Sequence, residues 1–382
     1  MTTLIEFFDK ETKTLSVPYY FDDSLKDIPK ETETIIFIRE EGYDYPCFNQ
    51  KVNNLPQNII CIKFCGDFNQ KVDKLPPKLK ELTFGNQFTQ KVDKLPSTLT
   101  HLTFGYYFNQ KVDNLPLTLT HLTFGYRFNK SVDNLPPNLT HLTFSCKFNK
   151  NIDKLSQTLT HLIFRNNFEN EFNKSVDNLP PNLTHLYFFG FFNKSVDNLP
   201  KKITHLTFGF RFNKKIDYFP QNLTHLTFGQ NFNKSLDKLP ENLIYLRLGW
   251  KFQNKIIMPK TLKQLFLTCN NILINNIPSH IEQLYIYFNN KNPQTKSDKK
   301  DLKNFNQIDE ETEYLQTDSE DFDSDLNEIR YKDSPRSWKD KKVENLPSTL
   351  KEIIIERTKF KENIKIPFGT KISICDFGDR EL

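Results

Sequence analysis

Seven histidines recur at one place in a repeated segment, and they are the residues of this chain best suited to chemistry. They are His101, His121, His141, His161, His185, His205 and His225. Imidazole changes its charge near neutral pH and is the commonest metal ligand in proteins. Evenly spaced imidazoles could therefore bind a metal, respond to pH or contact a partner, or they could be solvated side chains copied with the repeat.

Catalysis and metal binding are the weakest of these interpretations. A row of parallel rings is a poor tetrahedral cage for a metal ion. The histidines have no acid or nucleophile set apart from the repeat, and the sequence shows no glycine-rich phosphate loop or nucleophile elbow. We predict that the protein is not an enzyme, and that it uses no cofactor, metal or small-molecule substrate.

The histidines belong to a repeat with a step of twenty residues. The segment FNQKVDNLPLTLTHLTFGYR (108–127) is followed by FNKSVDNLPPNLTHLTFSCK (128–147). The opening phenylalanine recurs at Phe48, Phe68, Phe88, Phe108, Phe128, Phe148, Phe172, Phe192, Phe212, Phe232 and Phe252, with one insertion at 168–171. A period of this length indicates a solenoid, whose stacked turns present a surface for partners.

Each repeat predicts one short strand followed by a return segment. Leu102, Thr103 and Phe104 alternate apolar, polar and apolar, as a half-buried strand does. Pro116 has no amide hydrogen and therefore belongs on the return. We predict a β-rich, leucine-rich-repeat-like solenoid: a right-handed superhelix with a parallel sheet, about 20 residues per turn and very little helix.

The register also assigns side chains to the inside and the outside of the solenoid. The recurring phenylalanines face inward as core, and the asparagine after each one is expected to bond the backbone of a neighbouring turn. The histidines precede an inward leucine, so they face outward on the concave side. The two positions before the opening phenylalanine vary between repeats and lie on one rim. Its aromatic members are Tyr106, Tyr107, Tyr126, Phe210 and Trp250.

Both residue sets are candidate partner-binding surfaces. Aromatic side chains mixed with arginine are the composition of protein interfaces. For the rim, the alternative is packing of loops against one another. We predict that the variable rim positions, and the histidine column beside them, contact another protein.

The repeat pattern divides the chain into four parts. Residues 1–47 form an N-terminal cap with one divergent repeat, and 48–290 form the repeat solenoid. Residues 291–342 read as a disordered charged insertion, because they are polar and poor in large aliphatic residues. Residues 343–382 hold closing divergent repeats and a C-terminal cap, which a solenoid needs to cover its core.

Charge is unevenly distributed along the sequence. The run 309–328 holds ten acidic and no basic residues. Because the chain carries +5 overall and this run carries −10, the rest carries +15. A basic body could bind a polyanion or nucleic acid, which is our alternative function. Lysine and aspartate alternate within each repeat, however, so no basic stripe is visible, and this argues against nucleic acid.

The pattern F-N-x-x-[VI]-x-x-L-P resembles the FNIP repeat, a relative of leucine-rich repeats known from social amoebae and large amoeba-infecting DNA viruses. It is seen in Phe128, Asn129, Val132 and Pro136, with departures such as Thr89 for asparagine and Ser156 for proline. Some members carry an F-box, so the resemblance implies an interaction scaffold, and in its most specific form a substrate-recognition subunit of a ubiquitin ligase. The segment 1–27 shows no evident F-box pattern.

The remaining features concern location. The N-terminus lacks a secretory signal pattern, and no apolar run reaches membrane-spanning length. The six cysteines do not follow the repeat, which is typical of reduced thiols inside cells. We expect an intracellular monomer without a membrane partner, located in the host cytoplasm if it is viral.

Overall fold

The computed structural model describes residues 4–38, 48–165, 172–268, 272–287, 343, 345–356 and 364–375. The chain divides into two compact units, Met1–Phe232 and Asn233–Leu382. In each unit, every turn contributes one short strand to a parallel sheet. Among the described residues, the only helices are two short 3-10 turns, η1 (Leu4–Phe7) and η2 (Ile272–Asn276). The predicted β-rich solenoid with very little helix is therefore confirmed.

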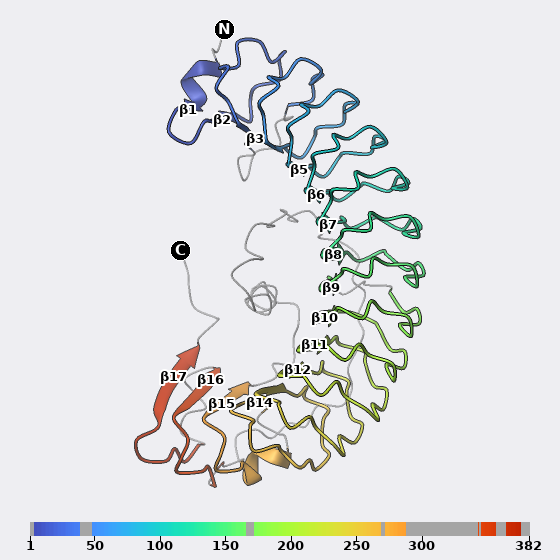
Figure 1. The fold of residues 1–382 in the computed structure, drawn as a ribbon. Coiled ribbons are helices and arrows are strands. Elements are labelled where there is room, and N and C mark those ends of the chain that lie inside the picture. Colours follow the sequence, from blue (N-terminus) through green and yellow to red (C-terminus); the bar gives the residue numbers. More distant parts are fainter. Residues whose placement is uncertain are drawn as a thin grey trace, which may run out of the picture. The chain divides into compact units, whose positions relative to one another are not determined.

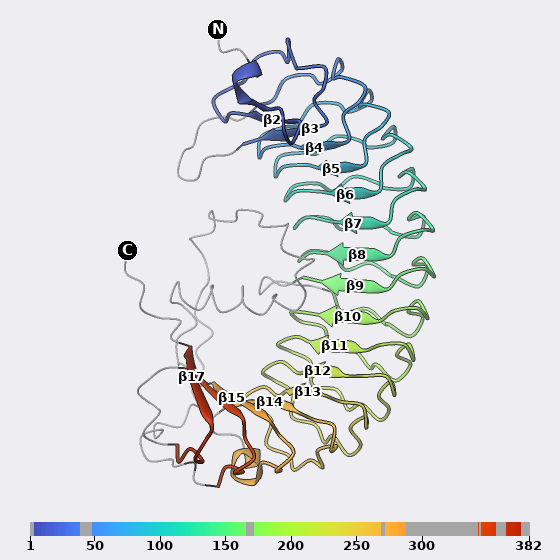
Figure 2. The ribbon, with the colours of Figure 1, turned by 60° about the vertical axis from the view of Figure 1, so that its left-hand side comes forward.

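In its described residues the first unit has eleven parallel strands, and the first of them also forms a hairpin with the strand that precedes it. Its strands are β1 (Phe8–Asp9), β2 (Thr14–Val17), β3 (Thr34–Phe37), β4 (Cys61–Lys63), β5 (Glu81–Thr83), β6 (His101–Thr103), β7 (His121–Thr123), β8 (His141–Phe144), β9 (His161–Phe164), β10 (His185–Phe188), β11 (His205–Phe208) and β12 (His225–Thr227). β1 pairs antiparallel with β2, and β2 to β12 pair in parallel in chain order. The strands lie on the concave side of this unit (Figure 1, Figure 2).

The second unit continues the same architecture with divergent turns. Its strands are β13 (Tyr245–Arg247), β14 (Gln264–Thr268), β15 (Gln283–Tyr287), β16 (Glu352–Glu356) and β17 (Lys371–Cys375). They pair in parallel in chain order. β15 and β16 are therefore neighbours in space, although they are far apart in the sequence. The insertion predicted over 291–342 lies between them in the sequence and outside the described residues.

Stacked phenylalanines form the core of the first unit. The rings of Phe104 and Phe108, from one turn, lie 3.7 Å apart between centroids, and Phe104 lies 5.8 Å from Phe124 of the next turn. All three side chains are at most 1 % exposed. Burying one such side chain contributes about 1.5–3 kcal/mol. The inward phenylalanine columns are therefore confirmed, and the twenty-residue register is what brings equivalent rings together.

Contacts between a side chain or backbone of one turn and the backbone of the next hold successive turns in register. The Asn109 side-chain oxygen accepts the amide hydrogen of Asn129 at 3.0 Å, and Asn129 does the same for Asn149 at 3.1 Å. The expected asparagine pairing is thus confirmed. After β5, β6, β7, β11 and β12 the backbones of successive turns approach closely. A Cβ atom added at Gly105 would lie 2.1 Å from the carbonyl oxygen of Gly85, so glycine is required at this position.

No helix in the described part of the chain is long and apolar enough to cross a membrane.

Candidate functional site

The seven histidines form one continuous column on the strand face of the first unit. The parallel register aligns His101 with His121, and each later histidine with the next. Successive imidazole centroids lie 4.1–4.3 Å apart, with the ring planes 11–14° from parallel. His101 is exposed and the other six are half-buried. The alignment, parallel rings and outward position of the histidines agree with the sequence prediction.

Every imidazole in the column contacts the hydroxyl of the threonine that precedes it. In all seven pairs the threonine Oγ1 lies 2.8–2.9 Å from Nδ1. The same hydroxyl lies 3.1–3.2 Å from a backbone carbonyl oxygen of the preceding turn. Thr120, for example, bridges His121 and the carbonyl of Thr100.

These two contacts determine which ring nitrogen carries the proton. A hydroxyl has one hydrogen, so Thr120 can donate to only one of its two partners. If it donated to Nδ1 of His121, its oxygen would face the Thr100 carbonyl oxygen with no hydrogen between them. If the hydroxyl donates to the carbonyl and Nδ1–H donates to the hydroxyl, both contacts are hydrogen bonds. We therefore assign the proton of each neutral ring to Nδ1, which leaves Nε2 as a hydrogen-bond acceptor.

The column also disfavours positive charge. Burial, and secondarily the charges of neighbouring histidines, lower the pKa of His121, His141 and His161 to about 4. The same causes lower the pKa of His205 to about 3. Burial is the larger cause, because the rings cover one another. At neutral pH these four side chains are uncharged.

No group of three or more possible metal ligands is present among the described residues.

The predicted rim brings five side chains of the first unit into contact. We define the first rim cluster as Tyr106, Tyr107, Tyr126, Arg127 and Lys147. The rings of Tyr106 and Tyr126 stack at 4.5 Å with planes 2° apart, and Tyr107 meets Tyr106 edge-on at 4.7 Å. Arg127 Cζ lies 4.7 Å from the Tyr107 centroid, and Lys147 Nζ lies 5.6 Å from that of Tyr126. The aromatic rings are half-buried and Arg127 is exposed.

Further along the same rim lies a second rim cluster: Phe191, Phe210 and Arg211. Arg211 Cζ lies 3.8 Å from the centroid of Phe191. Its backbone amide donates to the Gly190 carbonyl oxygen at 3.2 Å, as the Arg127 amide donates to that of Tyr106 at 2.9 Å. The last predicted rim residue, Trp250, belongs to the second unit, where Lys251 Nζ lies 5.2 Å from its ring centroid.

Comparison with known families agrees with these repeats. The model of the FNIP repeat matches residues 48–87, 68–107, 88–126, 108–147, 192–231 and 212–239. The chain carries FNIP repeats. Among solved structures, it is similar to the functional domain of InlJ from Listeria monocytogenes, which includes a cysteine ladder. The two are 16 % identical with a TM-score of 0.48, over 73 % of this chain and 69 % of that one. No curated protein matches the sequence significantly.

Beyond the matched FNIP repeats, the strand face of the second unit differs, and sequence reasoning missed it. Tyr245, Phe266 and Tyr285 are half-buried there, with Phe266 and Tyr285 stacked at 3.7 Å and Arg247 Cζ 5.8 Å from Phe266. The signal was present in the sequence. Phe266 lies between the inward Leu265 and Leu267, where an FNIP repeat places threonine.

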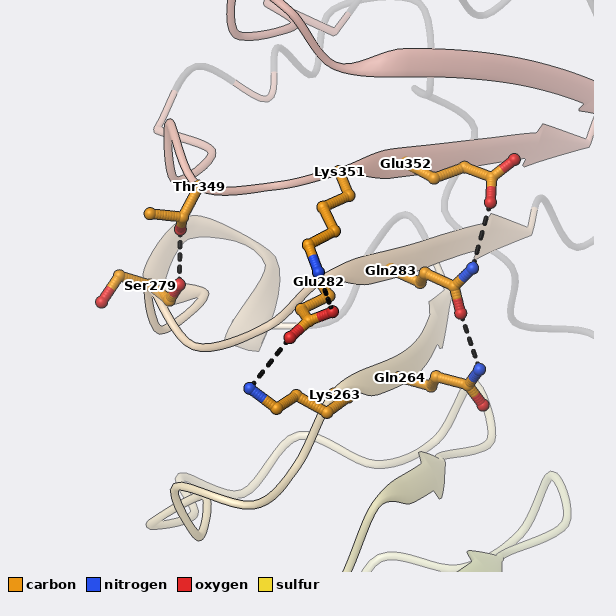
Figure 3. Close-up of polar contacts among 8 residues, drawn as sticks. All are labelled: Lys263, Gln264, Ser279, Glu282, Gln283, Thr349, Lys351 and Glu352. Atoms are coloured by element: carbon orange, nitrogen blue, oxygen red, sulfur yellow. Dashed lines mark hydrogen bonds and ion pairs between the residues drawn. The ribbon is translucent and has the colours of Figure 1, made fainter.

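Polar ladders link neighbouring strands of the second unit (Figure 3). Gln264 donates to Gln283 at 2.6 Å, and Gln283 donates to Glu352 at 3.1 Å. Glu282 binds Lys351 at 2.6 Å and Lys263 at 3.0 Å, and these contacts lower the pKa of its carboxyl group. The ladders connect β14, β15 and β16, so their evident role is to hold the divergent turns together.

Three cysteines of the first unit lie in its core, and one of them has a perturbed thiol. Cys61, Cys65 and Cys146 are buried. Burial, with the nearby Glu81 carboxylate, raises the pKa of Cys61 to about 11. A thiol must lose its proton to become a nucleophile or a metal ligand, so Cys61 is unreactive at neutral pH.

Proposed function

We propose that the protein is a non-enzymatic scaffold that binds another protein through the rim of its first unit. The observation that carries this proposal is the first rim cluster. Three tyrosines and an arginine are packed together at positions where otherwise regular repeats vary. Tyrosine, tryptophan and arginine dominate the residues that contribute most to binding at protein interfaces. Repeat solenoids generally serve as extended binding surfaces.

The test begins with capture of partners from cells that naturally express the gene, followed by binding measurements between purified proteins. The triple variant Tyr106→Ser, Tyr107→Ser and Phe210→Ser should weaken binding about 30-fold or more, since truncating a central interface residue costs about 2 kcal/mol or more. The control replaces Leu117 and Tyr218 with serine. These side chains are 68 % and 77 % exposed and lie outside the rim. Equal binding by the triple variant and the parent would refute the rim as the binding surface.

A substrate-recognition subunit of a ubiquitin ligase is the most specific form of this proposal. Its support is the resemblance to a family with F-box-bearing members. It predicts that core ligase subunits co-purify with the full chain, and that the captured partner is ubiquitinated faster when the chain is present. A partner whose ubiquitination is independent of the chain would reject this form and leave the scaffold proposal standing.

A further inference from the structure

Two exposed arginines of the rim each lie against an aromatic ring of the preceding turn. Arg127 follows Tyr107 by one repeat, and its Cζ lies 4.7 Å from that ring centroid. Arg211 follows Phe191 by one repeat, and its Cζ lies 3.8 Å from that centroid. The same contact is therefore built twice, from different aromatic residues, where the repeat itself does not demand it.

Neither arginine forms an ion pair with a carboxylate in the part of the chain that the structure describes. Arg127 and Arg211 are both exposed. A guanidinium carries five N–H donors in one plane and binds a carboxylate through two of them at once. Contact with a ring restricts that plane before binding, so less side-chain freedom is lost when the carboxylate arrives. Both arginines are therefore oriented to bind an anion.

Four of the five rim segments from Arg127 to Arg211 are positive or uncharged, whereas 165–171 holds one arginine and two glutamates, Glu169 and Glu171. The rim segments 125–127, 145–147, 189–191 and 209–211 contain two arginines and one lysine but no aspartate or glutamate. The return segments differ, because there Asp113 accepts a hydrogen bond from Asn134 and Asp217 pairs with Lys215 at 2.5 Å. Negative charge is therefore present in the repeats but excluded from these rim segments.

We propose that the rim binds an acidic segment of another polypeptide, with Arg127 and Arg211 each holding one carboxylate. The aromatic rings between them cover apolar side chains of the same segment. This inference rests on the proposed function and names the chemistry of its partner. Four inter-strand steps of about 4.8 Å separate the two arginines, or about 19 Å. An extended chain covers that distance in about six residues, so the partner carries two acidic residues about six positions apart.

The ring geometry favours a polypeptide over single-stranded nucleic acid. Binding of bases requires free aromatic faces on which they can stack. Tyr126 has Tyr106 against one face and the Lys147 ammonium 5.6 Å from its centroid. Tyr107 and Phe191 each have one face covered by an arginine. The rim therefore offers mainly ring edges and cations, which suit carboxylates and aliphatic groups better than nucleobases.

The experiment measures binding of a labelled random copolymer of glutamate and tyrosine to the full chain at physiological salt. The double variant Arg127→Gln and Arg211→Gln should bind it at least about tenfold more weakly. Arg127→Lys with Arg211→Lys keeps the charge but loses the planar fork, so an intermediate loss is expected. Lys91→Gln with Lys111→Gln removes the same charge from exposed positions outside the rim and should change the affinity less than twofold.

Three results would overturn the inference: no binding of the copolymer to the parent, an equal loss in the lysine control, or tighter arginine-dependent binding of a 20-nucleotide oligouridine. Melting temperatures close to that of the parent verify that the variants are folded. Suppose that the arginine substitutions leave binding of the copolymer unchanged while the serine substitutions at Tyr106, Tyr107 and Phe210 still weaken binding of the captured partner. In that case this inference fails and the scaffold proposal stands.

Discussion

The hydroxyl oxygen of Thr140 lies 2.9 Å from Nδ1 of His141 and 3.2 Å from the carbonyl oxygen of Thr120 on the preceding turn. One side chain thus joins the backbone of one turn to the imidazole of the next. Because the pattern recurs in seven turns, it fixes the orientation of the whole histidine column. It also fixes the protonation pattern of the neutral rings, which gives the strand face a row of Nε2 acceptors.

Replacing Thr140 with valine should allow the proton of the neutral His141 ring to move from Nδ1 to Nε2. Valine has nearly the same shape but no hydroxyl, so the ring loses its acceptor and becomes free to carry the proton on Nε2. The ¹⁵N chemical shifts of the ring nitrogens distinguish the two tautomers directly. Thr158→Val is the matched control, because the Thr158 hydroxyl oxygen lies 3.0 Å and 2.7 Å from the carbonyl oxygens of Pro137 and Leu139. A parent protein whose His141 already carries the proton on Nε2 would contradict the assignment.

Stability should fall when the solution is acidified below about pH 6.5. The folded-state pKa is about 4 for His121, His141 and His161 and about 3 for His205, against 6.5 for a free histidine. Between these values the unfolded chain binds more protons than the folded one, so protons favour unfolding. The stability is fully present above pH 6.5 and is lost as the pH falls through the folded values.

Urea unfolding midpoints at several pH values between 6.5 and 4.5 measure this effect, because few carboxyl groups titrate in that interval. A variant with glutamine at all four positions cannot gain these protons. Its midpoint should depend less on pH than that of the parent. Identical pH slopes for the two proteins would show that the column does not control acid stability.

Which side chains face inward and which face outward could be predicted from the sequence, because the same twenty-residue period applies to every turn. Once Leu102 is placed inward, Phe104, Phe108 and their equivalents must follow, and the outward position of the histidines follows as well. Proton positions could not be predicted in this way. The threonine before each histidine was visible in the sequence, but its hydroxyl has several possible hydrogen-bond partners. The side-chain rotamer and the position of the neighbouring carbonyl determine which partner it binds.

The rim contacts also depend on neighbours that the sequence does not place side by side. Tyr107 and Arg127 are twenty residues apart, and they make contact only because they occupy equivalent positions in neighbouring turns. The aromatic face of the second unit was missed because side-chain positions were assigned from the FNIP pattern, and Phe266 and Tyr285 do not follow that pattern. The N-terminal hairpin of β1 and β2 was missed for the same reason, since a cap has no equivalent in the repeat.

The asparagine ladder predicts a position-specific loss of stability. Asn129→Ala removes the acceptor of the Asn149 amide hydrogen and should cost about 1 kcal/mol, the usual net contribution of one hydrogen bond. Asn129→Asp keeps the acceptor oxygen and should retain most of that stability. Asn134→Ala, which removes an exposed contact to Asp113, should cost less than about 0.5 kcal/mol. Chemical denaturation measures all three, and equal costs for the two alanine variants would refute a special role for the ladder.

The phenylalanine columns predict the largest loss. Phe128 is fully buried, stacks on Phe124 at 3.7 Å, and lies 6.2 Å and 6.1 Å from the equivalent rings of the turns on either side. Phe128→Ala should therefore destabilise the protein by about 3–5 kcal/mol, since it removes a buried ring and leaves a cavity between three turns.

Phe368→Ala is the matched control for this substitution, because the Phe368 side chain is fully exposed in the second unit. Its cost should stay within about 0.5 kcal/mol. Because each turn of a solenoid contacts only its neighbours, weakening one central turn should also let the segments on either side unfold separately. Hydrogen exchange would then show protection lost first around residues 108–148. A cost below about 1 kcal/mol for Phe128→Ala would mean that the turns can close the cavity, and that the aromatic stack does not hold this fold together.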